Sequence, residues 1–567
     1  MPIVCLPLYL TRLLSAKICL IKTSQTWLRL FSGLFLVFGL ALVTGCSSLP
    51  NAVNRPVSTA LTNPASTPLG QTVARRAATA GTRNDSGFAL VHTADLAFTS
   101  RMTLINAAQK TLDIQYYAIF ADSTTERLFA ALRAAAARGV RIRILLDDFN
   151  ASGKNAQVLK LAFEKNIELR LFNPIPGNRS ALALRLLTNV HDVNRIQRRM
   201  HNKILVADNA IAITGGRNLG ETYFGQSSGT NFVDVDVLAA GRIVRDLSRS
   251  FDAYWNNPLA YPVQSLISAQ EIDALKLPLV GMSTSSALVI DNRFGVEDAK
   301  PTATAENNPN ITPLLDAVNL QLMQWTWASS TLLVDKPSKI AADADAVEQS
   351  QDTTVDGLLQ LMGQAQKEVL IVSPYFVPGA RMMAVFAGLR QRGVRVRVLT
   401  NSLASNDAPA AHVGYARYRE ALLKLGMEIF EMRAESPQAQ RKTTPRFLGS
   451  GGAGSVSSRA SLHAKVVVID NRLLVVGSMN LDLRSQLQNS EVAIAIRSAA
   501  LSREAAGLIE PAMANAAWQV MLLPNGRLLW RAPQGSNLPD SLTEPDASVG
   551  LKALLLLIAP FAPDEML

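Results

Sequence analysis

The chain has 567 residues, of which 48% are hydrophobic and only 18% are charged. This composition excludes an intrinsically disordered chain, and the length predicts two domains with extensions rather than a single core. The formal net charge of +11 favours an anionic partner, either nucleic acid or an acidic lipid surface.

The N-terminal segment has the features of a lipoprotein signal. Residues 30–43 form an almost wholly apolar run, and small residues then lead to Cys46. This pattern predicts cleavage before Cys46 and attachment of lipid to it, which makes residues 1–45 a signal peptide. The alternative is an uncleaved membrane anchor, but a spanning helix needs roughly 18–20 apolar residues and the run is shorter.

Residues 46–85 are rich in Ser, Thr, Asn, Pro and Ala, and we expect them to form a flexible tether. The three cysteines are Cys5, Cys19 and Cys46. The folded body after the tether therefore has no thiol for a disulfide or for a cysteine-based zinc site.

An internal repeat divides the rest of the chain into two halves. Residues 107–117 and 363–373 each indicate a helix end that runs into a strand, and residues 138–145 and 392–399 each indicate a helix stop at Gly followed by another strand. Strand, helix and strand form a βαβ unit. The repeat predicts an α/β fold with two pseudo-symmetric domains, each a mostly parallel sheet flanked by helices.

We expect the N-terminal domain to cover residues 86–280 and the C-terminal domain to cover residues 351–505. A connecting segment over residues 281–350 and a C-terminal tail over residues 506–567 complete the chain. The tail contains an apolar run at 551–561 that is too short to span a bilayer. It either dips into a membrane interface or packs on the protein's own surface.

Arginines alternate with apolar residues in both repeated strands, at Arg141, Arg143, Arg395 and Arg397. Such a pattern could serve nucleic-acid binding. Because it also belongs to a repeated crossover, we expect these arginines to lie on solvated or edge faces of the strands.

A His-x-Lys-x-x-x-x-Asp motif occurs once in each half, within residues 195–222 and 457–484. Its members are His201, Lys203 and Asp208 in the first copy, and His463, Lys465 and Asp470 in the second. Strand side chains alternate between faces, so a His and a Lys two positions apart can contact one ligand. Each Asp has the opposite parity, and we expect it to support the local structure.

These residue types suit cleavage of a phosphodiester. Lys203 and Lys465 can stabilise charge on the nonbridging oxygens, and Asn218 and Asn480, on Gly-rich turns after each motif, can add amide donors. One imidazole attacks phosphorus while the other protonates the leaving alcohol, and the roles then reverse. This route forms a phosphohistidine and requires no metal and no cofactor. The other histidines show no metal-ligand spacing.

The duplicated motif resembles that of the phospholipase D superfamily, in which each half contributes one motif to a shared active site. An attacking imidazole also needs a carboxylate on its far nitrogen. The resemblance places Glu491 and Asp236 in this role, and Asp234 is a competing choice of the same strand parity. Ser478 offers a hydroxyl in the second turn, whereas Gly216 stands at that place in the first.

Longer stretches around both motifs resemble the bacterial cardiolipin synthases of the C-type class. They are residues 198–203, 215–224, 232–241 and 400–419. The resemblance implies a phosphatidyltransferase that takes its phosphatidyl group from phosphatidylglycerol or phosphatidylethanolamine and passes it to a second phosphatidylglycerol. It also favours His201 as the nucleophile and His463 as the general acid.

Three alternatives remain open: hydrolysis to phosphatidic acid, a nuclease of the same fold, and a non-catalytic membrane scaffold. The lipid anchor and the lack of an aromatic-interleaved basic stretch disfavour nucleic acid as partner. Retention of His, Lys and Asn in both halves disfavours a scaffold. With Cys46, these inferences imply a lipid-anchored enzyme of the cell envelope that faces the periplasm. The sequence does not decide whether an accessory protein takes part.

Overall fold

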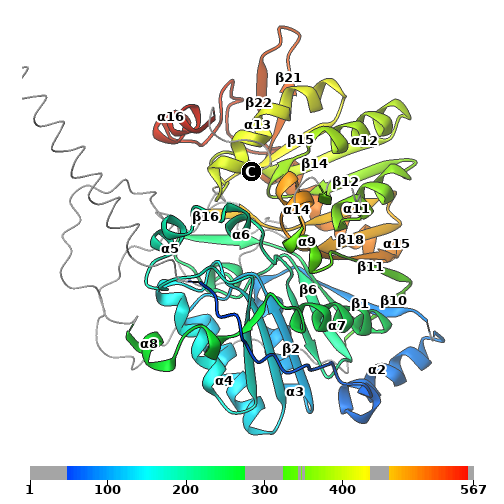
Figure 1. Cartoon of the computed structure of the whole chain (residues 1–567). Coiled ribbons are helices and arrows are strands. Elements are labelled where there is room, and N and C mark those ends of the chain that lie inside the picture. The colour runs from blue at the N-terminus through cyan, green and yellow to red at the C-terminus, as the bar shows by residue number, and fades with distance from the viewer. Residues whose placement is uncertain are drawn as a thin grey trace, which may run out of the picture.

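The computed structural model describes residues 48–82, 84–274, 323–342, 346–347, 352–434 and 459–559. The predicted signal peptide, the lipidation site Cys46 and much of the predicted connecting segment lie outside these ranges. The described chain forms two stacked halves, the first below and the second above in Figure 1. Within these ranges, no helix is long and apolar enough to cross a membrane.

The first half contains a nine-stranded sheet in the order β10-β1-β8-β6-β5-β2-β3-β4-β9. Its strands are β1 (Ser86–Val91), β2 (Thr111–Tyr116), β3 (Arg141–Asp147), β4 (Ile167–Phe172), β5 (Ile204–Ala207), β6 (Ile211–Gly215), β8 (Asp236–Gly241), β9 (Ala260–Pro262) and β10 (Thr326–Ala328). The adjacent strands β2, β3 and β4 are parallel, and the remaining pairs are antiparallel. The parallel block is the repeated unit that the sequence predicts.

The second half repeats this plan in the order β11-β20-β18-β17-β12-β14-β15-β21-β22. Its strands are β11 (Ser330–Val334), β12 (Glu368–Val372), β14 (Arg395–Asn401), β15 (Glu428–Met432), β17 (Val466–Ile469), β18 (Leu473–Gly477), β20 (Val492–Arg497), β21 (Ala517–Leu522) and β22 (Leu528–Arg531). Here β12, β14 and β15 form the parallel block. Two short pairs complete the strands: β7 (Thr230–Val233) with β16 (Arg459–Leu462), and β13 (Phe376–Val377) with β19 (Leu481–Asp482).

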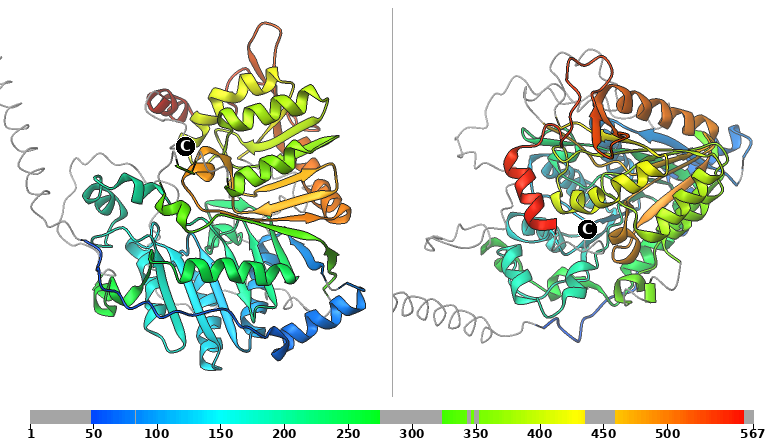
Figure 2. Two further views of the ribbon diagram at one scale, coloured as in Figure 1. Left: turned by 45° about the vertical axis from the view of Figure 1, so that its right-hand side comes forward. Right: turned by 90° about the horizontal axis from the view of Figure 1, so that it is seen from above.

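Helices flank both sheets, as Figures 1 and 2 show. In the first half they are α2 (Pro68–Thr79), α3 (Ala94–Ala107), α4 (Ser123–Ala137), α5 (Leu182–Thr188), α6 (Val193–Gln197), α7 (Arg242–Trp255) and α8 (Ala269–Ala274). In the second half they are α9 (Ser338–Ala341), α11 (Thr354–Gly363), α12 (Gly379–Gln391), α13 (Pro409–Lys424), α14 (Leu483–Leu487), α15 (Ala499–Ala516) and α16 (Val549–Ile558). Short 3-10 helices are η1 (Pro64–Ser66), η2 (Gly153–Phe163), η3 (Glu221–Tyr223) and η4 (Val263–Ser265).

The two motif strands join three hydrophobic cores. Val206 of β5 and Val468 of β17 lie together in a core shared by both halves, to which α7 and α15 also contribute. Their neighbours Leu205 and Val467 point into separate outer cores of the first and second half. Because side chains alternate between the two faces of a strand, each motif strand packs against its own half on one face and against the other half on the other face. The predicted fold class, two pseudo-symmetric α/β halves flanked by helices, is confirmed. The parallel part of each described sheet is the central block alone, with two parallel pairs among eight, because the flanking strands are joined by antiparallel connections.

The expectation that the alternating arginines are all solvated is wrong for two of them. Arg143 is fully buried and pairs with Asp113 (2.7 Å) and with Asp252 of α7 (2.8 Å). Arg397 is also buried and contacts Glu368 at 2.7 Å. Carboxylates on neighbouring elements neutralise these strand arginines, so they stabilise the packing of helices on the sheets and are not available to an external anion.

The predicted tether and tail are both packed parts of the body where the structure describes them. Helix α2 lies within the expected tether, and Arg170 and Asn209 donate hydrogen bonds to the carbonyls of Pro56 and Leu61. Residues of the expected tail form β21 and β22 at the edge of the second sheet. Low-complexity composition is a poor guide here because backbone groups of this segment find donors on the first half.

Candidate active site

The two halves meet where their His-Lys motifs begin. The His201 amide donates to the Ser490 carbonyl of the second half (2.9 Å), and the His463 amide donates to the Val233 carbonyl of the first half (2.8 Å). Strand β7 runs parallel to β16 directly before His463. Each histidine is thus held by the backbone of the opposite half, and the two motifs form one site.

The first histidine binds a carboxylate of the second half. His201 Nδ1 lies 3.0 Å from both carboxylate oxygens of Glu491. The hydroxyls of Ser478 and Ser485 donate to the same carboxylate. Burial raises the pKa of Glu491 to about 7, while Lys203 and the two serines oppose the rise.

The second histidine binds a carboxylate of the first half, and this carboxylate is Asp234. His463 Nδ1 lies 2.7 Å from Asp234 Oδ2. Burial by itself raises the pKa of Asp234, but His463, Lys465 and Arg217 outweigh it and hold the pKa at about 2. Asp234 is therefore an ionised carboxylate at neutral pH.

The expectation that Asp236 supports a histidine is wrong. Asp236 instead binds Arg101 (2.9 Å) and Arg217 (3.3 Å). Sheet register gives the reason. Gly215 pairs with Asp236 and Gly477 pairs with Ala493, so Asp236 corresponds to Ala493, and Asp234, two residues earlier, corresponds to Glu491.

The two lysines lie in the same orientation on either side of the site. Lys203 Nζ donates to the His201 carbonyl (2.7 Å), and Lys465 Nζ donates to the His463 carbonyl (2.6 Å). Burial lowers the pKa of Lys203 to about 7 and lowers that of Lys465 as well. Their ammonium groups are poorly solvated, so they gain most from an anion bound between them.

Electrostatic coupling shows that both motifs share one space. Burial lowers the pKa of His201 well below its ordinary value, and both Lys203 and Lys465 lower it further. Burial also lowers the pKa of His463 to about 3, with contributions from the same two lysines, while Asp234 opposes the shift. Both imidazoles are neutral in the resting site, and each carries a lone pair.

The motif aspartates lie away from the reacting groups. Asp208 accepts hydrogen bonds from the amides of Gln109, Lys110 and Thr111, at 2.8 to 2.9 Å. Asp470 accepts three equivalent bonds from Gln366, Lys367 and Glu368. Both aspartates adopt a positive φ of 52° at the turn after the motif strand. They hold this turn against the start of the repeated β2 or β12 strand, in the supporting role that their parity predicts.

The two turn asparagines are not equivalent. Asn218 donates to the Tyr223 hydroxyl (2.9 Å) and accepts from the Ala118 amide (3.3 Å). The Oδ1 atom of Asn480 is buried and has no hydrogen-bond partner among the described residues. Phosphate binding by these amides remains a prediction.

Sequence reasoning missed an aromatic wall around the site. Tyr117 packs edge-on against His201, with ring centres 5.0 Å apart, and Tyr223 and Phe232 pack against His463 at 5.2 and 5.0 Å. The Tyr375 hydroxyl donates to both oxygens of Asp407 (2.9 Å). Burial lowers the pKa of Lys465, and the charge of Asp407 partly opposes this shift. Tyr117 and Tyr375 follow the repeated strands β2 and β12, so the internal repeat is the sequence signal that could have identified these two residues.

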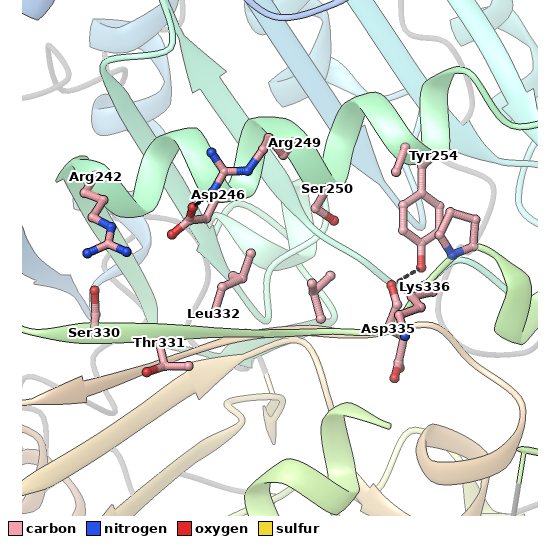
Figure 3. A pocket seen from close by; sticks show the side chains of 13 residues that line it. Arg242, Asp246, Arg249, Ser250, Tyr254, Ser330, Thr331, Leu332, Asp335 and Lys336 are labelled. Atoms are coloured by element: carbon pink, nitrogen blue, oxygen red, sulfur yellow. Dashed lines mark hydrogen bonds and ion pairs between the residues drawn. The ribbon is translucent and has the colours of Figure 1, made fainter. Parts of the chain in front are cut away.

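An open groove between α7 and β11 lies at the junction of the halves and is lined by Arg242, Arg249 and Leu332, among others (Figure 3). None of its lining residues belongs to either motif. Asp335, at one end of it, accepts a hydrogen bond from the Glu491 amide (2.9 Å) and one from Lys339 (2.8 Å). The connecting segment therefore fixes the strand end that carries Glu491.

Two neutral imidazoles, each bound to a carboxylate of the other half and flanked by a buried lysine, define a pseudo-symmetric phosphodiester-transferring site on a phospholipase D fold. Comparison with known proteins agrees. The family described as "Cardiolipin synthase, PLD-like domain" matches residues 102–255 and 358–511. Cardiolipin synthase C of Escherichia coli is 34% identical over 474 residues, which cover 83% of this chain and 94% of that protein.

Cardiolipin synthase B of the same species is 24% identical over 392 residues, 69% of this chain and 72% of that one. A phosphatidylserine synthase from Haemophilus influenzae shares the fold, with a TM-score of 0.55 over 88% of this chain and 99% of its own at 14% identity. The chain belongs to the cardiolipin synthase family of phospholipase D-like proteins. It is an enzyme of the phosphatidyltransferase and phosphodiesterase type.

Proposed function

We propose that this enzyme makes cardiolipin by moving a phosphatidyl group from one membrane phospholipid to another. The donor is phosphatidylglycerol or phosphatidylethanolamine, and the acceptor is the headgroup hydroxyl of a second phosphatidylglycerol. The observation that carries the proposal is the crossed pairing of His201 with Glu491 and of His463 with Asp234. Family membership supplies the lipid substrate class.

In the first step, the lone pair of His201 Nε2 attacks phosphorus and forms an N–P bond. The bond from phosphorus to the headgroup oxygen breaks, and a proton from His463 passes to that oxygen, which releases glycerol or ethanolamine. Lys203 and Lys465 stabilise the nonbridging oxygens as charge builds on them. A bound phosphate anion also raises the pKa of both histidines, which lets His463 carry its proton.

In the second step, the acceptor hydroxyl gives its proton to His463 and its oxygen attacks phosphorus. The N–P bond breaks, and His201 returns to its neutral state. Glu491 accepts the Nδ1 hydrogen bond of His201 throughout and stabilises the positive charge on the phosphohistidine ring. No step draws on a metal or a cofactor, because the lysines balance the phosphate charge.

The unequal carboxylates support His201 as the nucleophile. Asp234 is fully ionised and raises the pKa of His463, which suits the histidine that must hold a proton. Glu491 has a pKa of about 7 and is the weaker electrostatic partner, so His201 keeps its lone pair more readily. The assignment agrees with the sequence resemblance.

We also infer that the enzyme is anchored in the cell envelope by lipid on Cys46 and faces the periplasm. The apolar run and the small residues before Cys46 support this inference. Intact-mass analysis of membrane-extracted protein tests it. The expected mass lacks residues 1–45 and includes acyl chains, and Cys46→Ser should leave an unprocessed precursor. A mature N-terminus elsewhere would contradict the inference.

The decisive experiment for the reaction is lipid mass spectrometry after purified protein is incubated with labelled phosphatidylglycerol, with and without phosphatidylethanolamine. Cardiolipin as the main product supports the proposal. Phosphatidic acid as the main product makes the enzyme a hydrolase. If the folded, unmutated protein forms no product at all, phosphatidyl transfer is contradicted. A chelator should leave the rate unchanged, and the purified chain should make cardiolipin without any added protein.

A further inference from the structure

Large hydrophobic side chains are exposed at two separate places near the active site. In the described residues, seven of the ten exposed large hydrophobics lie either on the α5–α6 pair or on α16. We call these seven the apolar surface: Leu184, Leu187, Val190 and Val193 on the first, and Val549, Leu554 and Leu557 on the second. Leu187 is 69% exposed and Leu557 is 71% exposed, so most of each residue is open to solvent. Single exposed leucines are ordinary, but a concentration of this kind needs a partner.

Helix α5 buries its charged residue and exposes apolar residues. Its one charged residue, Arg185, is fully buried, forms an ion pair with Asp148 and donates to the carbonyl of Ile175. Arg179, just before the helix, forms an ion pair with the same carboxylate. The charged side of this helix faces the protein, whereas Leu184 and Leu187 face outward, which is the reverse of the usual arrangement of a surface helix. Its buried ion pairs thus hold the apolar side outward.

Helix α16 presents apolar residues in the same way from the second half. Leu555 packs on the small cluster of Val377 and Val413, and Arg417 donates to the Ala559 carbonyl (2.6 Å). These contacts fix one side of the helix against α13. Leu554 and Leu557 remain on the exposed side.

Both helices project from the same side of the molecule, one from each half, as the views in Figures 1 and 2 agree. The α5–α6 pair is joined to the shared site by the chain, and α16 is linked to it through α13. Helix α6 ends four residues before His201, and its last carbonyl, that of Gln197, accepts a hydrogen bond from Arg484. Helix α13, on which α16 packs, begins two residues after Asp407.

We propose that the apolar surface docks the enzyme on a phospholipid bilayer with the shared site facing the lipid. This proposal rests on the proposed function for the identity of the substrate. A diacyl lipid reaches a protein site most easily when the site opens at the bilayer, where its acyl chains stay among other chains. The chain from Cys46 onward lacks the four basic residues of the signal peptide and still has a formal net charge of +7, which complements the anionic headgroups of phosphatidylglycerol. The bilayer is therefore the occupant that substrate, charge and placement all favour.

Site-specific fluorescence tests which side docks. In the full chain with Cys5, Cys19 and Cys46 changed to Ser, a single cysteine is introduced as L187C, L557C or R503C and labelled with an environment-sensitive dye. Arg503 is exposed on α15, on the opposite side of the molecule in Figure 1. Vesicles of phosphatidylglycerol and phosphatidylethanolamine carry a nitroxide quencher on their acyl chains. The N-terminal segment can hold all three proteins at the vesicle, so differences between labels report the docked side.

We expect at least threefold stronger quenching at 187 and at 557 than at 503. Equal quenching at all three positions, or none at any, would overturn the proposal. Energy transfer between labelled copies without vesicles, in the absence of lipid quenching, would also overturn it and would identify a second copy as the occupant. These readouts do not depend on product formation, so failure of cardiolipin synthesis leaves them intact.

An activity test connects docking with turnover. The variant L187E/L557E should lose about tenfold in turnover of vesicle-embedded phosphatidylglycerol, because two leucines no longer enter the interface. Its turnover of a short-chain phosphatidylglycerol dissolved as monomers should match that of the unchanged protein. Leu187→Phe and Arg503→Glu serve as apolar and charge-matched controls and should keep full activity on both substrates. Equal losses on both substrates would show a structural defect and contradict a docking role.

Discussion

The two histidine–carboxylate pairs look alike in sequence but differ in their electrostatics. Asp234 beside His463 has a pKa of about 2, because His463, Lys465 and Arg217 outweigh the effect of burial. Glu491 beside His201 has a pKa of about 7, because burial outweighs Lys203 and the serine donors. One pair thus keeps a full negative charge next to its imidazole, and the other shares its charge with hydroxyls. A pseudo-symmetric fold can supply an acid and a nucleophile by varying only the surroundings of two similar pairs.

The turn residues explain how this difference is built. A Cβ atom at Gly216 would lie 2.3 Å from Asp234 Oδ1, so glycine leaves room for the short Asp side chain to lie over the turn. Ser478, at the corresponding place, instead donates a hydrogen bond to the longer Glu491. Glycine with aspartate in one half, and serine with glutamate in the other, are therefore two ways to place a carboxylate beside the histidine.

The largest effect expected is from the histidines themselves. His201→Ala and His463→Ala should each lower turnover by about 10⁴-fold or more, because nucleophile and acid act as one unit and such losses are not additive. Cardiolipin mass spectrometry measures this, and circular dichroism checks that both proteins fold. Acid quench with phosphorus-labelled donor should place the label on His201. Label on His463 would reverse the roles assigned to the two pairs.

Removal of the carboxylate charge should lower kcat by different factors in the two histidine–carboxylate pairs. Asp234→Asn should lower kcat by about 10³-fold and Glu491→Gln by about 10²-fold, since the first change removes a full charge and the second replaces a carboxylate that is half protonated near pH 7. Asp113→Asn is the matched control, because this buried carboxylate pairs with Arg143 and not with a histidine. Equal losses for the two histidine partners would contradict the electrostatic difference.

The turns offer a smaller but more specific effect. Gly216→Ser should lower turnover by about 10²-fold because the new side chain displaces Asp234 from His463, whereas Ser478→Gly removes one hydrogen bond and should cost about tenfold. Steady-state rates on the same vesicles compare the two. If Gly216→Ser is the milder change, the packing explanation is wrong.

The pH dependence of kcat/KM should be a narrow bell centred near pH 7. Below this value Glu491 gains a proton and no longer accepts from His201, and above it Lys203 loses its proton and its charge. Glu491→Gln should remove the acidic limb and leave the basic one, and Lys203→Arg should move the basic limb upward. An unchanged acidic limb in the Glu491 variant would assign that limb to another group.

The smallest effect on chemistry is expected from the motif aspartates. Asp208 is fully buried and Asp470 is partly exposed, though each accepts three backbone amides. Asp208→Ala should therefore lower the free energy of unfolding by about 3 kcal/mol and Asp470→Ala by about 1 kcal/mol, because water can replace the lost acceptor only at the second site. Chemical denaturation measures both. Asn at either position tolerates the positive φ and should cost less.

The sequence by itself determined the repeat, the parallel strand block of each half and the four residues His201, Lys203, His463 and Lys465, because these features depend on local periodicity and spacing. The sequence also predicted a supporting role for the motif aspartates, because their strand parity is opposite to that of the His and Lys. The choice between Asp234 and Asp236 was beyond it, since both have the same parity and only the pairing of β6 with β8 distinguishes them.

Tertiary structure alone decided which half supplies each carboxylate, that Arg143 and Arg397 are buried in ion pairs, and that the segment before β1 packs on the first half. It also placed Leu184 and Leu187 of α5 on the outside by burying Arg185. The physical reason is common to all of these features. Each depends on partners far away in the chain, and burial decides whether a charge is neutralised or a hydrophobic side chain is exposed.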